Sequence, residues 1–391
     1  MSEVTLQSPA WRGAAGRLAA DDELGVPWTA LDTPALLIDL DRLEGNIATM
    51  ADHARGGGVA LRPHFKTHKS VAIARRQLAA GASGVTVAKL DEAEALIDAG
   101  VDTPILLAFE LVGAPKLERA LLLAARSRLT LAVDSVDGAM RLAGAAAAAG
   151  MVLDVWIEID SGLARCGVLP AEAPALARAV TGFHALNLTG MFTHAGQSYA
   201  AHSVAEVATI AETEAAMVVD AANATRAIGI PVDAVSAGST PTARFLRGSS
   251  GLTEIRPGTY VFFDSLQVAL GSAQPEECAL TVAATVISRP APDRVVIDAG
   301  SKTLGLDKGA HSSTLLDDYG TVLDVEGALV RLSEEHGMLR VAPGSPLAIG
   351  DHIRIVPNHV CTVSNLGRRF HGLRNGIVTE IIPLDAAGGV H

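Results

Sequence analysis

A cluster of basic residues at positions 61–69 (LRPHFKTHK) is the segment of the sequence best suited to chemistry. Five of its nine residues are basic, although the chain as a whole is acidic. The cluster follows an expected buried strand, and extended backbone would place His64, Lys66 and His68 on one face. Partial burial and neighbouring cations lower the pKa of a lysine and favour the neutral amine that Schiff-base chemistry requires. Lys66 is therefore a candidate nucleophile, and an ordinary solvated basic loop is the alternative.

A second candidate segment, 158–167 (EIDSGLARCG), also follows an expected strand and contains glycines on both sides of its arginine. An arginine held in such a tight loop can present several hydrogen-bond donors to an anionic oxygen. A salt bridge from Arg165 to Glu158 or Asp160 is the structural alternative, and it is compatible with the functional role.

Two later loops have the composition of a phosphate site. The loop 236–242 (SAGSTPT) joins a strand to a helix expected to begin near Pro241, and 254–260 (EIRPGTY) follows the neighbouring strand. Backbone N–H groups and hydroxyls at such positions suit one phosphate, while a plain helix N-cap is the alternative for the first loop. The candidate residues are Gly238, Ser239, Thr240, Gly258, Thr259 and Tyr260.

Two further positions could bind a metal ion or move a proton. In extended backbone, His359 and Cys361 of the segment 357–361 (PNHVC) point to the same side, and imidazole and thiolate are ligands that Zn²⁺ accepts. Two protein ligands would leave positions for substrate or water. A buried Cys361 beside a hydrogen-bonded His359 is the alternative. His194, at the end of another strand, is a candidate acid–base group, with a capping or core histidine as the alternative.

The elements that must position these residues alternate along the first two-thirds of the chain. Short runs rich in Val, Ile and Leu predict buried strands, and the Ala- and Leu-rich segments between them predict helices. About eight such units over about 230 residues predict a (β/α)₈ TIM barrel of the α/β class, in which chemistry gathers where strands end. The strands are expected at 35–40, 59–65, 84–89, 104–109, 129–134, 153–160, 188–194 and 234–238.

The pattern changes beyond about residue 265. Strand-like segments there are joined by turns that contain Pro, Gly, Asp or Asn, which predicts a second, mostly antiparallel β-domain. We expect an N-terminal arm over 1–30, the barrel over 31–268 and a β-domain carrying the His359–Cys361 pair over 269–391.

Composition excludes several classes of protein. The formal net charge is −12, so the chain has no general attraction for nucleic acid or for anionic membrane surfaces. Three widely spaced cysteines cannot build a disulfide framework and indicate a reducing compartment. The sequence contains neither the apolar core of a signal peptide nor an uncharged run of the roughly 20 apolar residues that cross a bilayer. We therefore expect a cytoplasmic protein that binds any anion in a local pocket.

The motifs RPHFKTHK, IDSGLARCG, THAG, AGSTPT, IRPGTYVFFD, EEHG and PNHVC occur in one order along the chain. With this set the sequence resembles the family of D-threonine aldolase, D-serine dehydratase and the 3-hydroxy-D-aspartate lyases. These proteins are alanine-racemase-like (fold type III) pyridoxal phosphate enzymes. The resemblance extends from about residue 30 to about residue 385, and RPHxKTHK and PNHxC are its specific motifs.

The resemblance implies a role for each candidate residue. Lys66 would bind pyridoxal phosphate as a Schiff base, and Arg165 would contact the phenolic oxygen or the ring edge of the cofactor. His359 and Cys361 would be the metal ligands, and His194 would be a base at the β-hydroxyl of the substrate. The family also implies a homodimer with the active site between barrel and β-domain. The phosphate cup would consist of Gly238, Ser239, Thr240, Gly258, Thr259 and Tyr260.

The family pattern supports two reactions on β-hydroxy-D-amino acids. With Lys66 removing the α-proton and a metal assisting loss of the hydroxyl, elimination yields a 2-oxo acid and ammonia. With His194 taking the hydroxyl proton, the Cα–Cβ bond breaks to give glycine and an aldehyde. Cys361 favours the dehydratase and Zn²⁺, with Mn²⁺ or Mg²⁺ as alternatives, because aldolase members tend to carry His-x-Asp. An amino-acid racemase, which leaves the metal pair unexplained, and a non-catalytic pyridoxal phosphate carrier are the rival interpretations.

Overall fold

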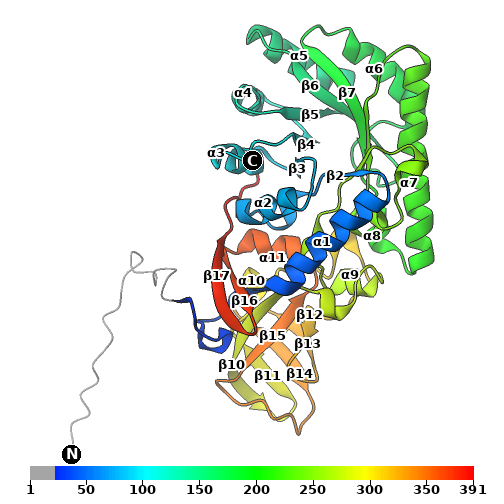
Figure 1. The fold of residues 1–391 in the computed structure, drawn as a ribbon. Coiled ribbons are helices and arrows are strands. Elements are labelled where there is room, and N and C mark those ends of the chain that lie inside the picture. The colour runs from blue at the N-terminus through cyan, green and yellow to red at the C-terminus, as the bar shows by residue number, and fades with distance from the viewer. Residues whose placement is uncertain (1–22) are drawn as a thin grey trace, which may run out of the picture.

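The computed structural model describes residues 23–391, so most of the arm expected at 1–30 lies outside the described residues. Residues 25–28 run along the last strand of the chain. The Gly25 N–H donates to the Val378 carbonyl (2.8 Å), and the Trp28 N–H donates to the Gly376 carbonyl (3.0 Å). A barrel and a β-sheet domain follow, one above the other in Figure 1. No helix within residues 23–391 is both long enough and apolar enough to cross a membrane.

Eight parallel strands curl into the barrel, in the order β2-β9-β8-β7-β6-β5-β4-β3. A single parallel bridge between His64 and Thr86 links the two ends of this sheet. The predicted TIM-type barrel is therefore confirmed. Its strands are β2 (Ala60–Leu61), β3 (Val85–Val87), β4 (Ile105–Glu110), β5 (Leu129–Val133), β6 (Leu153–Ile159), β7 (Leu186–Thr193), β8 (Ala234–Ala237) and β9 (Glu254–Ile255).

Helices cover the outside of the barrel, as the three-four spacing predicts. Several begin at a residue whose side chain accepts a backbone hydrogen bond, such as Ser135 and Ser203. The α-helices within residues 23–391 are α1 (Leu40–Gly56), α2 (Val71–Ala79), α3 (Leu90–Asp98), α4 (Ala114–Ala124), α5 (Val136–Ala148), α6 (Ala173–Thr181), α7 (Val204–Ala227), α8 (Thr240–Ala243), α9 (Ser265–Ala269), α10 (Ser301–Leu304) and α11 (Val360–Leu366). The last two, α10 and α11, lie between strands of the second sheet.

The second domain is a nine-stranded, mostly antiparallel sheet, in agreement with the sequence. Its main path runs β13-β14-β11-β10-β1-β16-β17, and β15 pairs with both β10 and β12. The strands are β1 (Ala35–Asp39), β10 (Leu280–Ala291), β11 (Arg294–Ile297), β12 (Gly320–Val322), β13 (Gly327–Leu332), β14 (Gly337–Val341), β15 (His352–Pro357), β16 (Arg369–Arg374) and β17 (Ile377–Pro383).

The prediction that the strand at 35–40 belongs to the barrel is wrong. It forms β1, but β1 lies in the second sheet, antiparallel to β10 and parallel to β16. β9, which follows a turn near Gly251, completes the barrel in its place. A short apolar run that is buried on both faces has the same composition in either sheet, so the sequence pattern does not say which sheet it joins.

Candidate active site

Lys66 lies where the first barrel strand ends. β2 leads into a 3₁₀ turn at Phe65–Thr67, and His64 caps this turn by accepting a hydrogen bond at Nδ1 from the Lys66 N–H (3.4 Å). The Lys66 side chain is partly buried. Burial lowers the pKa of Lys66 against the opposing effect of negative charge on the Cys361 sulfur. The direction of this pKa shift favours the neutral amine that the sequence suggested.

His68 does not share the face of Lys66, so the extended geometry predicted through this segment is wrong. The 3₁₀ turn rotates His68 into the core, where its Nε2 lies 3.1 Å from Oε1 of Gln77. Its ring is fully buried, and burial lowers its pKa to about 3. His68 is therefore a neutral structural residue.

Two adjoining chambers, each of about 280 Å³, share the side chains of His64, Lys66, His194 and Arg256. One chamber lies between the barrel and the β-domain, and the other lies over the mouth of the barrel. The first also contains Thr67, Tyr199, Ser239, Thr240, Gly258, Thr259, Ala310, His311, His359 and Cys361. The second also contains Ala88, Ala108, Phe109, Glu110, Arg165, Cys166 and Phe192. A larger cavity of about 520 Å³ in the β-domain contains none of the predicted site residues.

The predicted phosphate loops meet at the first chamber. The hydroxyl of Thr240 accepts hydrogen bonds from the N–H groups of Gly258 and Tyr260, both at 3.2 Å, which ties the two loops together. Ser239 also lines the chamber. A Cβ at Gly258 would lie 2.8 Å from the Thr67 hydroxyl and 3.2 Å from the His64 Cβ, so only glycine fits this position.

Two predicted members of the cup are oriented differently from the others. The Gly238 N–H faces away from the chamber toward Glu214 of α7 (3.4 Å). The Tyr260 ring is fully buried, and its hydroxyl accepts a hydrogen bond from Gln77 (3.0 Å). Neither Gly238 nor Tyr260 presents a hydroxyl to the chamber. The hydroxyls at the cup come from Ser239, Thr240 and Thr259.

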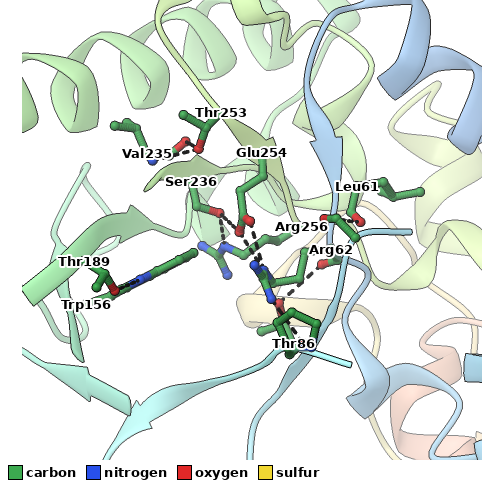
Figure 2. A network of polar contacts seen from close by, with 12 residues as sticks. Leu61, Arg62, Thr86, Trp156, Thr189, Val235, Ser236, Thr253, Glu254 and Arg256 are labelled. Atoms are coloured by element: carbon green, nitrogen blue, oxygen red, sulfur yellow. Dashed lines mark hydrogen bonds and ion pairs between the residues drawn. The ribbon is translucent and has the colours of Figure 1, made fainter. Parts of the chain in front are cut away.

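A buried polar network supports Arg256 behind the two chambers. Its Nε donates to the Ser236 hydroxyl (2.8 Å), which donates to Glu254 (2.8 Å), and Arg62 donates to both oxygens of Glu254 (2.9 Å each). Figure 2 shows this chain of contacts from Arg256 to Arg62. The Arg256 guanidinium also donates to the Thr193 carbonyl. The network fixes the Arg256 cation at the wall of the site, a role that the sequence alone did not indicate.

Arg165 lines the second chamber and pairs with Glu158 at 3.3 Å. The ion pair named as the structural alternative is thus present together with a position at the cavity. Burial raises the pKa of Glu158 to about 8, and Glu110 acts in the same direction. Glu110, Asp134 and Cys166 form the one group of three potential ligating side chains within 4.8 Å of one another in the described part of the chain.

The β-domain contributes His359 and Cys361 to the first chamber. His359 directly precedes α11, and its Nδ1 lies 3.2 Å from Oδ2 of Asp307. The Thr362 hydroxyl donates to the same carboxylate oxygen (2.5 Å). Burial lowers the pKa of His359, but Cys361 and Asp307 outweigh it and raise this pKa to about 10. Asp307, which no motif in the sequence indicated, therefore fixes the orientation of the imidazole.

Cys361 lies in the first turn of α11, so the extended conformation predicted through 357–361 ends at His359. Its Sγ is 3.3 Å from the Thr67 hydroxyl. Burial raises the pKa of Cys361, but His359 and Lys66 overcome this effect and lower it. No third ligating side chain within residues 23–391 completes a cluster with this pair.

His194 follows β7 and faces the β-domain. Its buried Nε2 has no hydrogen-bond partner among the described residues, and burial and Lys66 lower its pKa well below the ordinary value. The ring of His311 lies 5.5 Å from the ring of His194 and 5.2 Å from that of Tyr199. His311 has a left-handed backbone (φ 51°) and lies in the loop between β11 and β12, whose path the sequence does not indicate.

The residues of the chambers fit both groups that the resemblance implies. The buried Thr259 hydroxyl has no partner in the part of the chain that the structure describes, and beside Ser239 and Thr240 it suits a phosphate. The Cys361 thiol, whose pKa is lowered, and the His359 imidazole, which the Asp307 carboxylate orients, form the donor set of a zinc site with open positions.

Two family models match the chain. "Alanine racemase, N-terminal domain" matches residues 38–266, and "Putative serine dehydratase domain" matches residues 279–373. Together they cover the barrel and most of the β-domain.

Known relatives resemble the chain over most of its length. D-threo-3-hydroxyaspartate dehydratase of Delftia sp. (strain HT23) is 42% identical over 85% of this chain and 91% of the relative. D-threonine aldolase of Arthrobacter sp. is 34% identical over 93% of this chain and 95% of the relative. The crystal structure of D-threonine aldolase from Filomicrobium marinum superposes with a TM-score of 0.85 at 36% identity, covering 94% of this chain and 98% of that chain.

Proposed function

Because the chain belongs to the alanine-racemase-like, fold type III family of pyridoxal phosphate enzymes, among its D-threonine aldolases and hydroxy-D-amino acid dehydratases, we propose a lyase function for it. Its substrates would be β-hydroxy-D-amino acids, and its cofactors pyridoxal phosphate and a divalent metal. We favour the dehydratase reaction, in which water is eliminated and a 2-oxo acid and ammonia are released.

One observation supports this proposal above the others. Lys66 from the barrel and the pair His359 and Cys361 from the β-domain line the same chamber. An amine that can act on the α-carbon of a substrate therefore lies opposite two ligands that can act on its β-substituent. A racemase would need only the first of these groups.

The chain's own residues divide the reaction between them. When bound, pyridoxal phosphate supplies an electron-withdrawing ring and the metal supplies positive charge. Ser239, Thr240 and Thr259 would hold the phosphate, and Arg165 and Arg256 add positive charge at the walls. Lys66, its pKa lowered by burial, takes the α-proton. His359 and Cys361 would hold the metal, whose positive charge would assist the loss of the β-hydroxyl, and with one added proton this group leaves as water.

Retro-aldol cleavage is the second candidate, and the state of His194 supports it. The imidazole is neutral and its buried Nε2 has no partner within residues 23–391, so it can accept a proton from a β-hydroxyl. Cleavage of the Cα–Cβ bond would then give glycine and an aldehyde. A racemase is less well supported, because burial raises the pKa of Tyr199, the tyrosine at this chamber, well above the ordinary value.

Three finer features complete the proposal. The thiol of Cys361 favours Zn²⁺ over the harder Mn²⁺ and Mg²⁺. The family pattern favours a homodimer with the site between barrel and β-domain. The three free cysteines are consistent with the cytoplasm.

A substrate panel with product analysis tests the function. Purified protein is supplied with D-serine, D-threonine and D-3-hydroxyaspartate, and ammonia, 2-oxo acids, glycine and aldehydes are measured separately. The dehydratase reaction predicts ammonia and a 2-oxo acid in equal amounts. Glycine and an aldehyde without ammonia would reject the dehydratase in favour of the aldolase, and interconversion of D- and L-forms alone would reject both.

A further inference from the structure

Thr67, the residue after Lys66, lies where the three parts of the site meet. Its side chain is fully buried at the edge of the first chamber. The hydroxyl is 3.3 Å from the Cys361 Sγ. It also lies so close to Gly258 that a Cβ there would be 2.8 Å from it. The lysine, the cup and the proposed metal pair therefore converge on one hydroxyl group.

The direction of the hydrogen bond follows from the chemistry of the partners. A thiolate accepts hydrogen bonds and a hydroxyl donates them, so a charged Cys361 makes Thr67 the donor. A cysteine that binds a metal ion does so as the thiolate, so in the metal site proposed above Cys361 is the acceptor of this 3.3 Å contact. The β-branched side chain of threonine limits rotation at χ1, so the hydroxyl is held in one direction.

Other side chains hold the same turn of α11 from different sides. The Asp264 carboxylate accepts a hydrogen bond from the Val360 N–H (3.1 Å), and Asp307 holds His359 and Thr362. These contacts fix the backbone and the imidazole, and His359 also contacts the Cys361 sulfur from within the β-domain. Thr67 supplies the contact at the sulfur from the barrel side, and it comes from the same 3₁₀ turn as Lys66.

We propose that Thr67 is a positioning residue: its hydroxyl donates to the Cys361 thiolate and fixes the metal site relative to the Lys66 amine. The inference rests on the metal dependence proposed above. It explains why the residue after Lys66 is a threonine, with one hydroxyl and one methyl group, rather than a valine, with two methyl groups. It also predicts that the geometry of the metal site depends on a residue of the barrel that is not a ligand.

Two substitutions separate a hydrogen-bonding role from a packing role. Thr67→Val preserves the shape of the side chain and removes the donor, whereas Thr67→Ser preserves the donor and removes a methyl group. If Thr67 only fills space, the serine variant is the more damaged of the two. If it positions the thiolate, the valine variant is the more damaged and serine rescues it.

The native metal of the holoenzyme is exchanged for Co²⁺, and the Co²⁺ affinity and absorption spectrum are measured. Co²⁺ is the probe because a thiolate ligand gives it a charge-transfer absorption. We expect Thr67→Val to weaken Co²⁺ binding about 10- to 100-fold and to shift this band, while Thr67→Ser stays within about threefold of the wild type. The absorbance of bound pyridoxal phosphate should be unchanged in both variants. Thr67→Ala serves as a second donor-free variant if the valine protein does not fold.

The possible outcomes are distinguishable. Wild-type affinity and band in Thr67→Val, or a larger loss in Thr67→Ser, would overturn the positioning role while leaving the metal site intact. Absence of any thiolate band in the wild type would overturn the proposed metal pair itself, and the role of Thr67 with it.

Discussion

The two walls of the candidate site are built in different ways. On the barrel side, Lys66, Arg165 and His194 each follow a parallel strand, so the topology of the sheet brings them together. On the β-domain side, His359 precedes a helix of seven residues, and His311 comes from a loop between strands. The geometry there depends on individual side-chain hydrogen bonds rather than on a repeated element.

This difference indicates a division of labour. The barrel wall, with its buried Arg256–Glu254–Arg62 network, is part of the core and suits the permanent task of holding a cofactor. The β-domain wall is anchored by Asp307, whose side chain is half-exposed, and suits the metal. Changes in the first wall, apart from Thr67 at its contact with Cys361, should remove the cofactor or the fold, and changes in the second should affect the metal alone.

Replacing Lys66 should have the largest effect and tests the barrel wall. We expect Lys66→Ala to lower turnover of every substrate by at least about 10³-fold, because one change removes the covalent attachment of the cofactor and the α-proton acceptor. Steady-state kinetics and the visible absorption spectrum measure this. Lys302→Ala, at an exposed lysine of the β-domain, is the matched control. Unchanged turnover in Lys66→Ala would contradict the claim that the barrel wall holds the cofactor through Lys66.

Glu214 tests the barrel wall through stability. It is fully buried behind the Gly238 loop, and burial raises its pKa from the ordinary 4.5 to about 7. Between these values the folded protein binds more protons than the unfolded chain. The stabilisation from this group is therefore fully present below pH 4.5 and is lost as the pH rises through about 7.

We expect Glu214→Gln to remove this pH dependence, which amounts to about 3 kcal/mol of unfolding free energy between pH 5 and pH 8. Chemical denaturation of both proteins at the two pH values measures it. Glu212→Gln, at an exposed residue of the same helix, should behave as the wild type. An equal loss of stability in the wild type and Glu214→Gln would show that the carboxyl is already charged in the fold.

Asp307 tests the β-domain wall and should have the smallest effect. Asp307→Asn keeps the shape but loses the charge that holds the His359 imidazole, so we expect metal affinity to fall about tenfold. Competition with a chelator measures the affinity. The cofactor absorbance should not change, and Asp324→Asn, whose partner is Arg354, is the control. Loss of cofactor in Asp307→Asn would contradict the separation of the two walls.

The positions that follow from periodicity are the ones that the sequence predicts best. Alternating strands and helices predict a barrel, and in a barrel the ends of strands face one cavity, so Lys66, His194 and the Ser239 loop were expected to meet. The structure brings them together. The assignment of 35–40 to the barrel was wrong because pairing between sheets is decided by contacts distant in sequence.

The remaining features depend on local backbone geometry. A 3₁₀ turn, rather than an extended strand, separates His68 from Lys66. The positions of His311 and Asp307 are set by a loop that contains Gly305 and Gly309, both with positive φ. Neither residue is part of a periodic pattern, and only the folded loop brings them to His194 and His359.

The central claim is that the two walls hold different groups, and metal removal from the wild-type protein tests it most directly. After treatment with EDTA, the visible absorbance of the bound cofactor and the turnover of a β-hydroxy-D-amino acid are measured on one sample, before and after Zn²⁺ is returned. The account predicts that turnover disappears and recovers with Zn²⁺ while the absorbance persists throughout. Full activity in EDTA, or loss of the cofactor together with the metal, would contradict it.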